Sequence, residues 1–246
     1  ISGEALFLGM MRGMSQKVAI ITGAGRGIGR ATAGALHRRG YRLVLVSRNE
    51  RELRETAEAS DKDALIAPAD VTDPAALRKL VDQAVAAFGR IDAVVNNAGY
   101  APLRSVEAMT IDEWRATIDT NLSATFFLSQ AVWPVFRKQN GGVIVNLSSR
   151  AARDPFAGRG MYGAAKAGIN LLTLALAREG QPIGVRVHAI APGAVETGMF
   201  RSLATTDEVP TENTLDPADV AQVIADCITG PLAHTSGEVI WMHKRL

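Results

Sequence analysis

The stretch Val18-Ala-Ile-Ile-Thr-Gly-Ala-Gly-Arg-Gly-Ile-Gly29 decides the fold of this 246-residue chain. Its apolar start predicts a short buried strand, and the glycine cluster that follows predicts a tight turn. Residues Ala31 to Arg39 continue as a helix, with Gly40 just beyond its end. Glycines at such a turn let the backbone approach a pyrophosphate, whose charge is stabilised by the helix N-terminus. The stretch therefore predicts a strand, a phosphate-binding loop and a helix, although a ligand-free structural turn is the alternative for a glycine loop taken alone.

Strand-like and helix-like segments alternate along the rest of the chain. After the first strand, strands are expected at Tyr41–Val46, Ala64–Pro68, Ile91–Val95, Gly142–Leu147, Val185–Ile190 and Glu238–Met242. Helices are expected at Glu50–Ala59, Pro74–Phe88, Ile111–Gln139 with an interruption around Pro134, Met161–Arg178 and Pro217–Ile228. This order predicts an α/β fold: a doubly wound parallel sheet of about seven strands with helices on both faces. We find no linker, so residues 14–246 are expected to form one domain.

Composition narrows the classes of function. The chain is 47% hydrophobic and 21% charged with a net charge of +2, which is typical of a soluble globular protein. Since it has neither a basic run nor an apolar run of roughly eighteen residues, we expect no nucleic-acid partner and no membrane span. The lone Cys227 excludes an intrachain disulfide and suits a reducing cytoplasm. Because Met14 would begin the fold naturally, Ile1–Gly13 is expected to be an N-terminal extension or an expression remnant.

A second motif, Tyr162-Gly-Ala-Ala-Lys166, predicts acid–base chemistry. A four-residue offset on a helix places both side chains on one face, about one turn apart. An ammonium beside a phenol stabilises the phenolate, so we expect the pKa of Tyr162 to fall from its ordinary value of about 10. Ser149, thirteen residues before the tyrosine, supplies a hydroxyl that could hold a substrate oxygen at the same place. Taken alone, the pair could equally be a solvated helix face.

With these motifs in order, the chain resembles the compact, single-domain branch of the short-chain dehydrogenase/reductase family over about residues 16–240. The motifs that carry the resemblance are the glycine loop, Asp70-Val71, Asn96-Asn97-Ala98-Gly99, the Ser149/Tyr162/Lys166 set, and Pro192-Gly193 followed by Thr197. The resemblance implies a Rossmann-like fold, a nicotinamide cofactor and hydride transfer to or from a carbonyl or alcohol carbon. It also implies a homo-oligomer, dimer or tetramer, although the chain lacks the Asp-Gly-Gly tail of the family's tetramer contact.

The resemblance assigns catalytic roles to four residues. Ser149 would hold the substrate oxygen, and its spacing to the tyrosine selects it over Ser148. Tyr162 would give or take the proton as general acid/base. Lys166 would lower the pKa of the tyrosine and bind the nicotinamide ribose hydroxyls. Asn121, a poor residue for a helix interior, would help a water-linked proton path to the lysine.

The resemblance also implies where the cofactor lies. Asp70 and Val71 would contact the adenine, Asn97, Ala98 and Gly99 would line the strand end, and Val195 and Thr197 would face the carboxamide. Asp70 could instead cap the following helix, and Asn96 is expected to stabilise the sheet. The complete expected set is Gly23, Gly25, Arg26, Gly27, Ile28, Gly29, Ser47, Arg48, Asp70, Val71, Asn97, Ala98, Gly99, Tyr162, Lys166, Pro192, Gly193, Val195 and Thr197.

Ser47 and Arg48, at the end of the second strand, indicate NADP(H) as the cofactor. A carboxylate there would bind the ribose hydroxyls and repel a 2′-phosphate, and NAD-using relatives carry an aspartate in place of the serine. Arg26 and Arg48 can instead grip a phosphate in bidentate fashion. The alternative is that both arginines are solvated surface residues.

These features predict an NADP(H)-dependent carbonyl reductase that acts reversibly on a small-molecule carbonyl or alcohol. The alternatives are an idle NADP(H)-binding sensor or scaffold, an NAD-dependent alcohol dehydrogenase, and a sugar-nucleotide epimerase, which needs a larger C-terminal region. A 3-oxoacyl thioester, a steroid, a sugar and a xenobiotic ketone all remain open as substrates. An anionic substrate would be attracted by the arginines expected at the pocket mouth, unless they pair with carboxylates: Arg104, Arg150, Arg153 and Arg159. No metal site is expected, since the histidines are scattered at His37, His188, His234 and His243.

Overall fold

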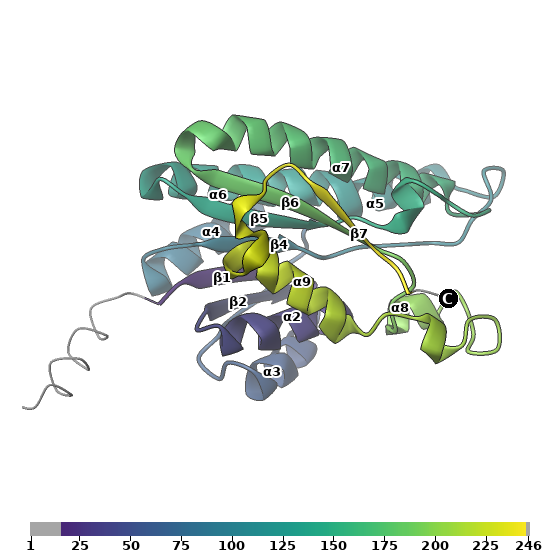
Figure 1. Cartoon of the computed structure of the whole chain (residues 1–246), viewed down its shortest axis with the longest axis horizontal. Coiled ribbons are helices and arrows are strands. Elements are labelled where there is room, and N and C mark those ends of the chain that lie inside the picture. The colour runs from purple at the N-terminus through teal and green to yellow at the C-terminus, as the bar shows by residue number, and fades with distance from the viewer. Residues whose placement is uncertain (1–15, 245–246) are drawn as a thin grey trace, which may run out of the picture.

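The computed structural model describes residues 16–244, in which seven parallel strands form one sheet in the order β3-β2-β1-β4-β5-β6-β7. Helices cover both faces of this sheet (Figure 1). The predicted doubly wound α/β architecture is therefore confirmed. The extension expected at residues 1–13 lies outside the described residues.

The strands lie close to their predicted positions. They are β1 (Val18–Thr22), β2 (Arg42–Ser47), β3 (Leu65–Pro68), β4 (Ala93–Asn96), β5 (Gly142–Leu147), β6 (Val185–Pro192) and β7 (Val239–Met242). Nearly all residues of the central strands are buried on both faces, which explains why their sequences are continuous apolar runs rather than alternating ones.

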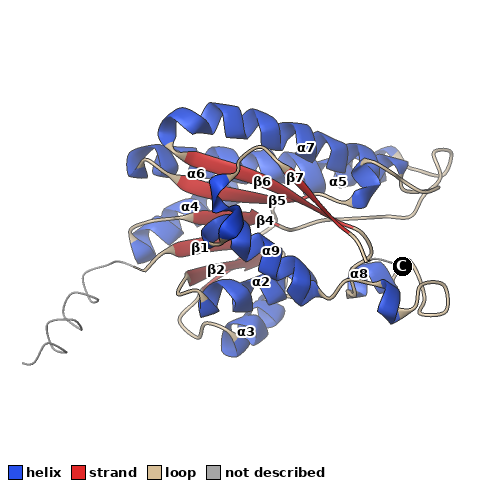
Figure 2. Ribbon diagram, in the orientation of Figure 1, coloured by secondary structure: helices blue, strands red, loops and turns tan. Residues whose placement is uncertain are grey.

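The main helices connect these strands and cover both faces of the sheet (Figure 2). They are α2 (Gly27–Arg38), α3 (Glu50–Ala59), α4 (Pro74–Phe88), α5 (Ile111–Ile118), α6 (Ala124–Gln139), α7 (Gly160–Gly180), α8 (Gly198–Arg201) and α9 (Pro217–Thr229). Short 3-10 turns follow at η2 (Arg150–Ala152), η3 (Gln181–Ile183), η4 (Thr211–Asn213) and η5 (Pro231–His234). In residues 16–244, no helix combines the length and the apolar character that crossing a membrane requires.

The core consists of two apolar layers, one on each face of the sheet. Ala19 and Ile21 of β1 pack in the layer beneath α2, α3 and α9, whereas Val18 and Ile20 pack in the layer beneath α4, α6 and α7. This alternation follows from the two-residue period of a strand. The two helix groups lie on opposite sides of the sheet in Figure 1.

The long helical segment after β4 is irregular, as predicted, but at a different position. The chain remains helical through Pro134, and the irregularity is a π-helical turn, η1 (Asp119–Ser123), between α5 and α6. Pro134 is exposed, so the carbonyl of Gln130 one turn earlier can tilt towards water instead of breaking the helix. The predicted interruption at Pro134 is therefore wrong.

The order in which strands are added to the sheet reverses between β1 and β4. This switch point is where a ligand site is expected. β1 pairs with β2 on one side and with β4 on the other, so the loops after β1 and β4 leave the sheet in opposite directions. In open parallel sheets, ligands bind in the crevice at the carboxyl ends of the strands at such a switch point. The glycine loop and the Asn97-Ala98-Gly99 segment meet there.

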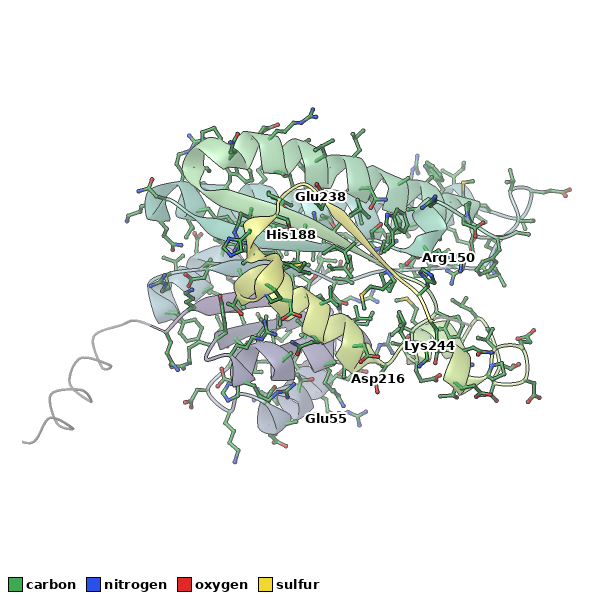
Figure 3. The ribbon with its side chains drawn as sticks, in the orientation of Figure 1. Glu55, Arg150, His188, Asp216, Glu238 and Lys244 are labelled. Carbon is green, nitrogen blue, oxygen red and sulfur yellow. The ribbon has the colours of Figure 1, made fainter. Side chains whose placement is uncertain are left out.

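His188 of β6, labelled in Figure 3, makes the fold sensitive to acid. Its side chain is fully buried, and neither ring nitrogen has a hydrogen-bond partner among the described residues. Burial, with a smaller contribution from the charge of Arg186, lowers the pKa of His188 to about 4. The unfolded chain thus binds this proton at a higher pH than the folded chain does.

We therefore expect stability to fall as pH drops from about 6.5 to about 4, by up to about 3 kcal/mol from this residue. His188→Leu should flatten this part of the stability profile, because the unfolded state then has no such proton to gain. Urea unfolding at a series of pH values measures the effect, with exposed His234→Leu as the matched control. A profile that His188→Leu leaves as steep as the wild type would contradict this account.

Candidate active site

The glycine loop between β1 and α2 is shaped by contacts that leave no room for side chains. Gly23 and Gly27 have φ angles of +63° and +53°, in the left-handed region that favours glycine. A Cβ on Gly29 would lie 2.1 Å from the carbonyl oxygen of Gly23, so the first turn of α2 packs directly on the loop. Ile28 packs against the core from the same turn. The loop thus presents backbone at a helix N-terminus, an arrangement suited to a pyrophosphate.

The loop is held in place by the end of β4. The Asn97 amide nitrogen Nδ2 donates to the carbonyl oxygens of Thr22 (2.9 Å) and Gly23 (3.2 Å). The Thr22 hydroxyl oxygen accepts hydrogen bonds from the backbone nitrogens of Asn97 and Ala98, each at 3.0 Å. Asn97 and Ala98 therefore support the glycine loop through hydrogen bonds to Thr22 and Gly23.

Asn96 braces the sheet, as predicted. Its Nδ2 donates to Asn146 Oδ1 at 2.9 Å, joining neighbouring strands β4 and β5. Asn146 in turn donates to the Thr173 hydroxyl at 2.9 Å. This buried polar chain ties the sheet to α7.

The end of β2 carries the residues predicted to select the cofactor. The Ser47 hydroxyl and Asn49 backbone bond to each other in a tight turn, with both distances 3.2 Å. Arg26 and Arg48 are exposed, and no carboxylate oxygen within residues 16–244 lies within 4.0 Å of either guanidinium. The two cations are thus available to a ligand.

A carboxylate that the sequence analysis missed also reaches this edge. Glu52 lies in the first turn of α3, and a Cβ on Gly25 would be 2.9 Å from Glu52 Oε2 and 3.5 Å from Ser47 Oγ. The acid is absent from the end of β2 in sequence but approaches from the following helix. Its position in the first turn of the helix that follows β2 was the only signal.

Asp70 forms a local turn after β3. Its Oδ1 accepts hydrogen bonds from the backbone nitrogen (2.9 Å) and hydroxyl (2.8 Å) of Thr72, and these bonds hold its pKa below the ordinary value. The cap of α4 is Asp73, which accepts from Ala75 at 2.8 Å, so the capping role considered for Asp70 is wrong. Val71 is buried in the core beside it.

Ser149, Tyr162 and Lys166 come together at the carboxyl end of β5. Ser149 follows this strand, while the other two occupy one face of the first two turns of α7. Lys166 is 3% exposed; its Nζ lies 5.5 Å from the Tyr162 ring centroid and donates to the carbonyl of Leu147 at 2.7 Å. Ser148 donates to the Lys166 carbonyl at 3.2 Å and thereby fixes this part of α7.

The acidity of Tyr162 differs from expectation. Burial raises its pKa, and the two effects that oppose burial are a hydrogen bond with Ser149 and the charge of Arg159. Burial also lowers the pKa of Lys166 to about 7, so its positive charge is only partial near neutrality. The predicted net fall in the tyrosine pKa is therefore wrong for this structure, because desolvation outweighs the nearby positive charge.

Asn121 lies in the π-helical turn η1, a distortion that frequently marks a functional position. Its Nδ2 donates to the carbonyls of Tyr100 (2.6 Å) and Thr117 (2.9 Å), whereas Oδ1 is buried and has no partner among the described residues. A Cβ on Gly99 would lie 3.1 Å from this Oδ1 and 3.9 Å from Lys166 Nζ. The free acceptor thus points towards the lysine region and suits a bound water.

The segment after β6 closes over the glycine loop. Pro192 ends the strand, Gly193 donates to the Met242 carbonyl at 2.8 Å, and Val195 pairs with Leu215. The Thr197 hydroxyl caps α8 by accepting from Phe200, and its methyl group would lie 3.1 Å from a Cβ on Gly27. Thr197 therefore lies beside the glycine loop.

Of the four arginines expected at the pocket mouth, three lie in exposed positions and have partners. Arg104 pairs with Glu113 at 2.9 Å, Arg150 with Asp154 at 3.0 Å, and Arg153 stacks on Trp241. Figure 3 places Arg150 at the end of the sheet where α7 begins. Only Arg159 is buried, with 7% of its surface exposed. The alternative of pairing with carboxylates therefore holds for Arg104 and Arg150, and the attraction of anions by a cluster of free arginines is not supported.

Comparison with known proteins points to one family. The family model described as short chain dehydrogenase matches residues 17–208. An uncharacterized oxidoreductase of Staphylococcus aureus (strain USA300) is 33% identical over 219 residues, covering 89% of this chain and 93% of the relative. An uncharacterized oxidoreductase of Staphylococcus epidermidis is 34% identical over 221 residues, covering 90% and 94%.

Solved structures agree with the sequence relatives. A 7 alpha-hydroxysteroid dehydrogenase complexed with NADH and 7-oxo glycochenodeoxycholic acid superposes with a TM-score of 0.88 at 28% identity, covering 93% of each chain. A 3-ketoacyl-(acyl-carrier-protein) reductase from Brucella melitensis complexed with NADH gives a TM-score of 0.87 at 28% identity, covering 93% of this chain and 97% of that one.

Proposed function

The chain belongs to the short-chain dehydrogenase family of oxidoreductases, and on that premise we propose that it is an NADP(H)-dependent carbonyl reductase. The observation that carries the proposal is the meeting of Ser149, Tyr162 and Lys166 at the carboxyl edge that also holds the glycine loop. A nicotinamide cofactor, when bound, supplies or accepts the hydride. The backbone loop, the pair of free cations and the unpartnered Asn121 oxygen all fit such a group.

The residues of the chain would manage the proton and the substrate oxygen. The Ser149 hydroxyl would hold that oxygen beside Tyr162, whose hydroxyl would donate the proton in reduction and recover it in oxidation. Lys166, held by the Leu147 carbonyl, would place a positive charge behind the tyrosine and offer hydrogen bonds to ribose hydroxyls. Water on Asn121 Oδ1 would connect this lysine to solvent.

Preference for NADP(H) rests on Arg26, Arg48 and Ser47. Both arginines are exposed, and no carboxylate oxygen of residues 16–244 lies within 4.0 Å of either, so they can bind a 2′-phosphate without first breaking an ion pair. Together with local hydrogen bonds, the charge of Arg48 also lowers the pKa of the nearby Asp70 carboxyl. Hydrogen bonds to charged groups contribute about 1.5–3 kcal/mol each, and 1.4 kcal/mol corresponds to a tenfold change. One good contact would therefore give at least about tenfold preference in kcat/KM.

NAD(H) is the second candidate cofactor because of Glu52. Its carboxylate lies beside Gly25 and Ser47, where an acid can bind ribose hydroxyls and repel a phosphate. The two solved relatives described above were both complexed with NADH. The sign of the preference therefore depends on whether the arginines or Glu52 dominate at this edge.

The proposed activity is tested by a panel of carbonyl substrates with NADPH and NADH in parallel, followed by nucleotide absorbance. The panel includes a 3-oxoacyl thioester, a steroid ketone, a sugar and a small aliphatic ketone. We expect turnover with at least one class and faster turnover with NADPH. Nucleotide binding without turnover on any class, in either direction, would instead support a sensor or scaffold.

Ser47→Asp is expected to reverse the cofactor preference, from at least about tenfold for NADPH to a preference for NADH. The new carboxylate would repel the 2′-phosphate and bind a ribose hydroxyl. Glu52→Gln is the complementary variant and should increase the preference for NADPH, because it removes the carboxylate already present. Equal kcat/KM for both cofactors in the wild type would contradict the arginine assignment.

We also propose that the protein forms a homo-oligomer and resides in a reducing compartment. Exposed apolar side chains on α5, α6 and α7 support a homo-oligomer, dimer or tetramer: Ile111, Trp114, Phe126 and Leu171. The buried free thiol of Cys227 supports a reducing compartment such as the cytoplasm.

A further inference from the structure

Arg159 is a buried cation at the entrance of helix α7. It occupies the position immediately before the helix and is 7% exposed. Its Nη1 donates to the Ala101 carbonyl at 3.0 Å, which fixes the guanidinium against the segment that follows β4. The backbone of the segment after β4 is itself held, because the backbone nitrogen of Arg104 donates a hydrogen bond to the Gly158 carbonyl at 3.0 Å. The position of the charge is thus set by the fold.

The fixed guanidinium lies over the ring of Tyr162. Its Cζ is 5.0 Å from the ring centroid and 5.6 Å from the centroid of Phe156. The three-residue offset between Arg159 and Tyr162 brings them to neighbouring positions at the helix start. A cation so close to the ring acts on the hydroxyl that the proposed reaction protonates and deprotonates.

Within the described part of the chain, no carboxylate neutralises Arg159. No acidic oxygen of residues 16–244 lies within 4.0 Å of its guanidinium nitrogens. The charged groups on the elements packed against this end of α7 are satisfied elsewhere: Arg104 with Glu113, Arg150 with Asp154, Arg153 over Trp241, and Asp119 with the Ser123 hydroxyl. Burying an unpaired cation is costly, so its place beside the reactive tyrosine calls for a function.

We propose that Arg159 is a positioning residue for Tyr162: its fixed positive charge stabilises the phenolate and sets the pH range in which this tyrosine exchanges its proton. The inference rests on the proposed function, since it concerns the same tyrosine. It adds a second cation to the one expected from the Tyr-x-x-x-Lys motif.

Lys166 alone does not supply a constant positive charge beside Tyr162. Its burial lowers its pKa to about 7, so a substantial fraction of the lysine is neutral at the pH where the enzyme would work. A guanidinium stays protonated throughout this range. Burial lowers the pKa of Arg159 as well, but from a much higher ordinary value. Arg159 thus supplies the constant part of the positive potential at Tyr162, and Lys166 the part that varies with pH.

Loss of the Arg159 charge should move the pH profiles of both reaction directions the same way. Removing the cation destabilises the phenolate, so the apparent pKa of the tyrosine rises. Oxidation of an alcohol needs the phenolate, so its rising kcat/KM limb should move to higher pH. Reduction needs the protonated tyrosine, so its falling limb should also move to higher pH. A nearby positive charge favours the phenolate. Burial raises the pKa of Tyr162 and the charge of Arg159 opposes that rise, so we expect both limbs to move measurably upward when that charge is removed.

The experiment compares three variants with the wild type. Arg159→Gln removes the charge but keeps an N–H group that can donate to Ala101, and Arg159→Lys keeps the charge. Arg178→Met is the matched control, because it removes one positive charge from an exposed site near the other end of the same helix. We expect the limb to move in Arg159→Gln, to move less in Arg159→Lys, and to stay in place in Arg178→Met.

A second readout needs neither substrate nor cofactor. The chain has three tyrosines, so tyrosinate absorbance records the ionisation of all three phenols together. Subtracting the titration of Tyr162→Phe isolates Tyr162. The isolated curve should move to higher pH in Arg159→Gln. Thermal unfolding of each variant establishes that the comparison is made on folded protein, and Arg159→Met, which also removes the charge, serves if Arg159→Gln does not fold.

Two outcomes would overturn the inference. In one, both the kinetic limb and the tyrosinate titration stay in place in Arg159→Gln. In the other, they stay in place while KM rises only for substrates with a carboxylate, which would make Arg159 a substrate contact. A wild type with no turnover would contradict the proposed function instead, and the absorbance titration would still test the role of Arg159.

Discussion

Tyr162→Phe is expected to lower kcat/KM by at least about 100-fold on any working substrate, because general acid–base catalysis contributes about 10²–10⁴-fold. The change removes one hydroxyl and leaves the ring in contact with Arg159 and Lys166. The glycine loop and its support from Asn97 are untouched, so cofactor affinity should stay close to that of the wild type.

Steady-state kinetics together with fluorescence titration of NADPH separate these two expectations. Tyr100→Phe is a suitable control, since it removes a hydroxyl from an exposed tyrosine near the same site. Activity of Tyr162→Phe within about tenfold of the wild type would remove the tyrosine from the proton-transfer step.

Lys166→Met is expected to reduce both turnover and cofactor affinity. The methionine preserves the apolar stem in its buried site but loses the ammonium, its bond to the Leu147 carbonyl and any bond to ribose hydroxyls. We expect kcat to fall at least about 100-fold, as for loss of an acid–base partner, and Kd for NADPH to rise at least about tenfold.

The two effects of Lys166→Met can be told apart by measurement. Fluorescence titration gives the Kd, and single-turnover kinetics at saturating NADPH gives the rate of the chemical step. An unchanged Kd with a reduced rate would remove the ribose contact and keep the electrostatic role. A lower melting temperature is not expected, because the buried amine has only one hydrogen-bond partner among the described residues.

Elements with strong local signals were predicted almost to the residue. Helix α4 starts at Pro74 after the Asp73 cap and ends at Phe88, followed by Gly89, whose φ of +77° lies in the left-handed region that favours glycine. Helix α3 starts after Asn49, which accepts a hydrogen bond from Glu52. Helix α2, by contrast, begins at Gly27 rather than near Ala31, because the last glycines of the loop form its first turn.

The environment of the candidate site residues could be predicted less fully from the sequence than the helices and strands. The spacing of Tyr162 and Lys166 gave their common face, but it could not give the desolvation that raises one pKa and lowers the other. Glu52 reaches the end of β2 only because α3 packs back over the glycine loop. Such effects depend on contacts between elements distant in sequence, and residue spacing within one element says nothing about them.

The crevice between β1 and β4 has a consequence for how the chain assembles. Thr22 and Asn97, which lock the phosphate loop, are 75 residues apart in sequence, so the loop stays unsupported until β4 has docked beside β1. We therefore expect a chain emerging from the ribosome to bind nucleotide only after this pairing is made. A nucleotide that binds the folded state and not the unfolded state stabilises the folded protein. At a concentration of 100 times its Kd, the nucleotide would raise the free energy of unfolding by about 2.7 kcal/mol. The cellular nucleotide pool would then contribute to the lifetime of the folded protein as well as to its chemistry.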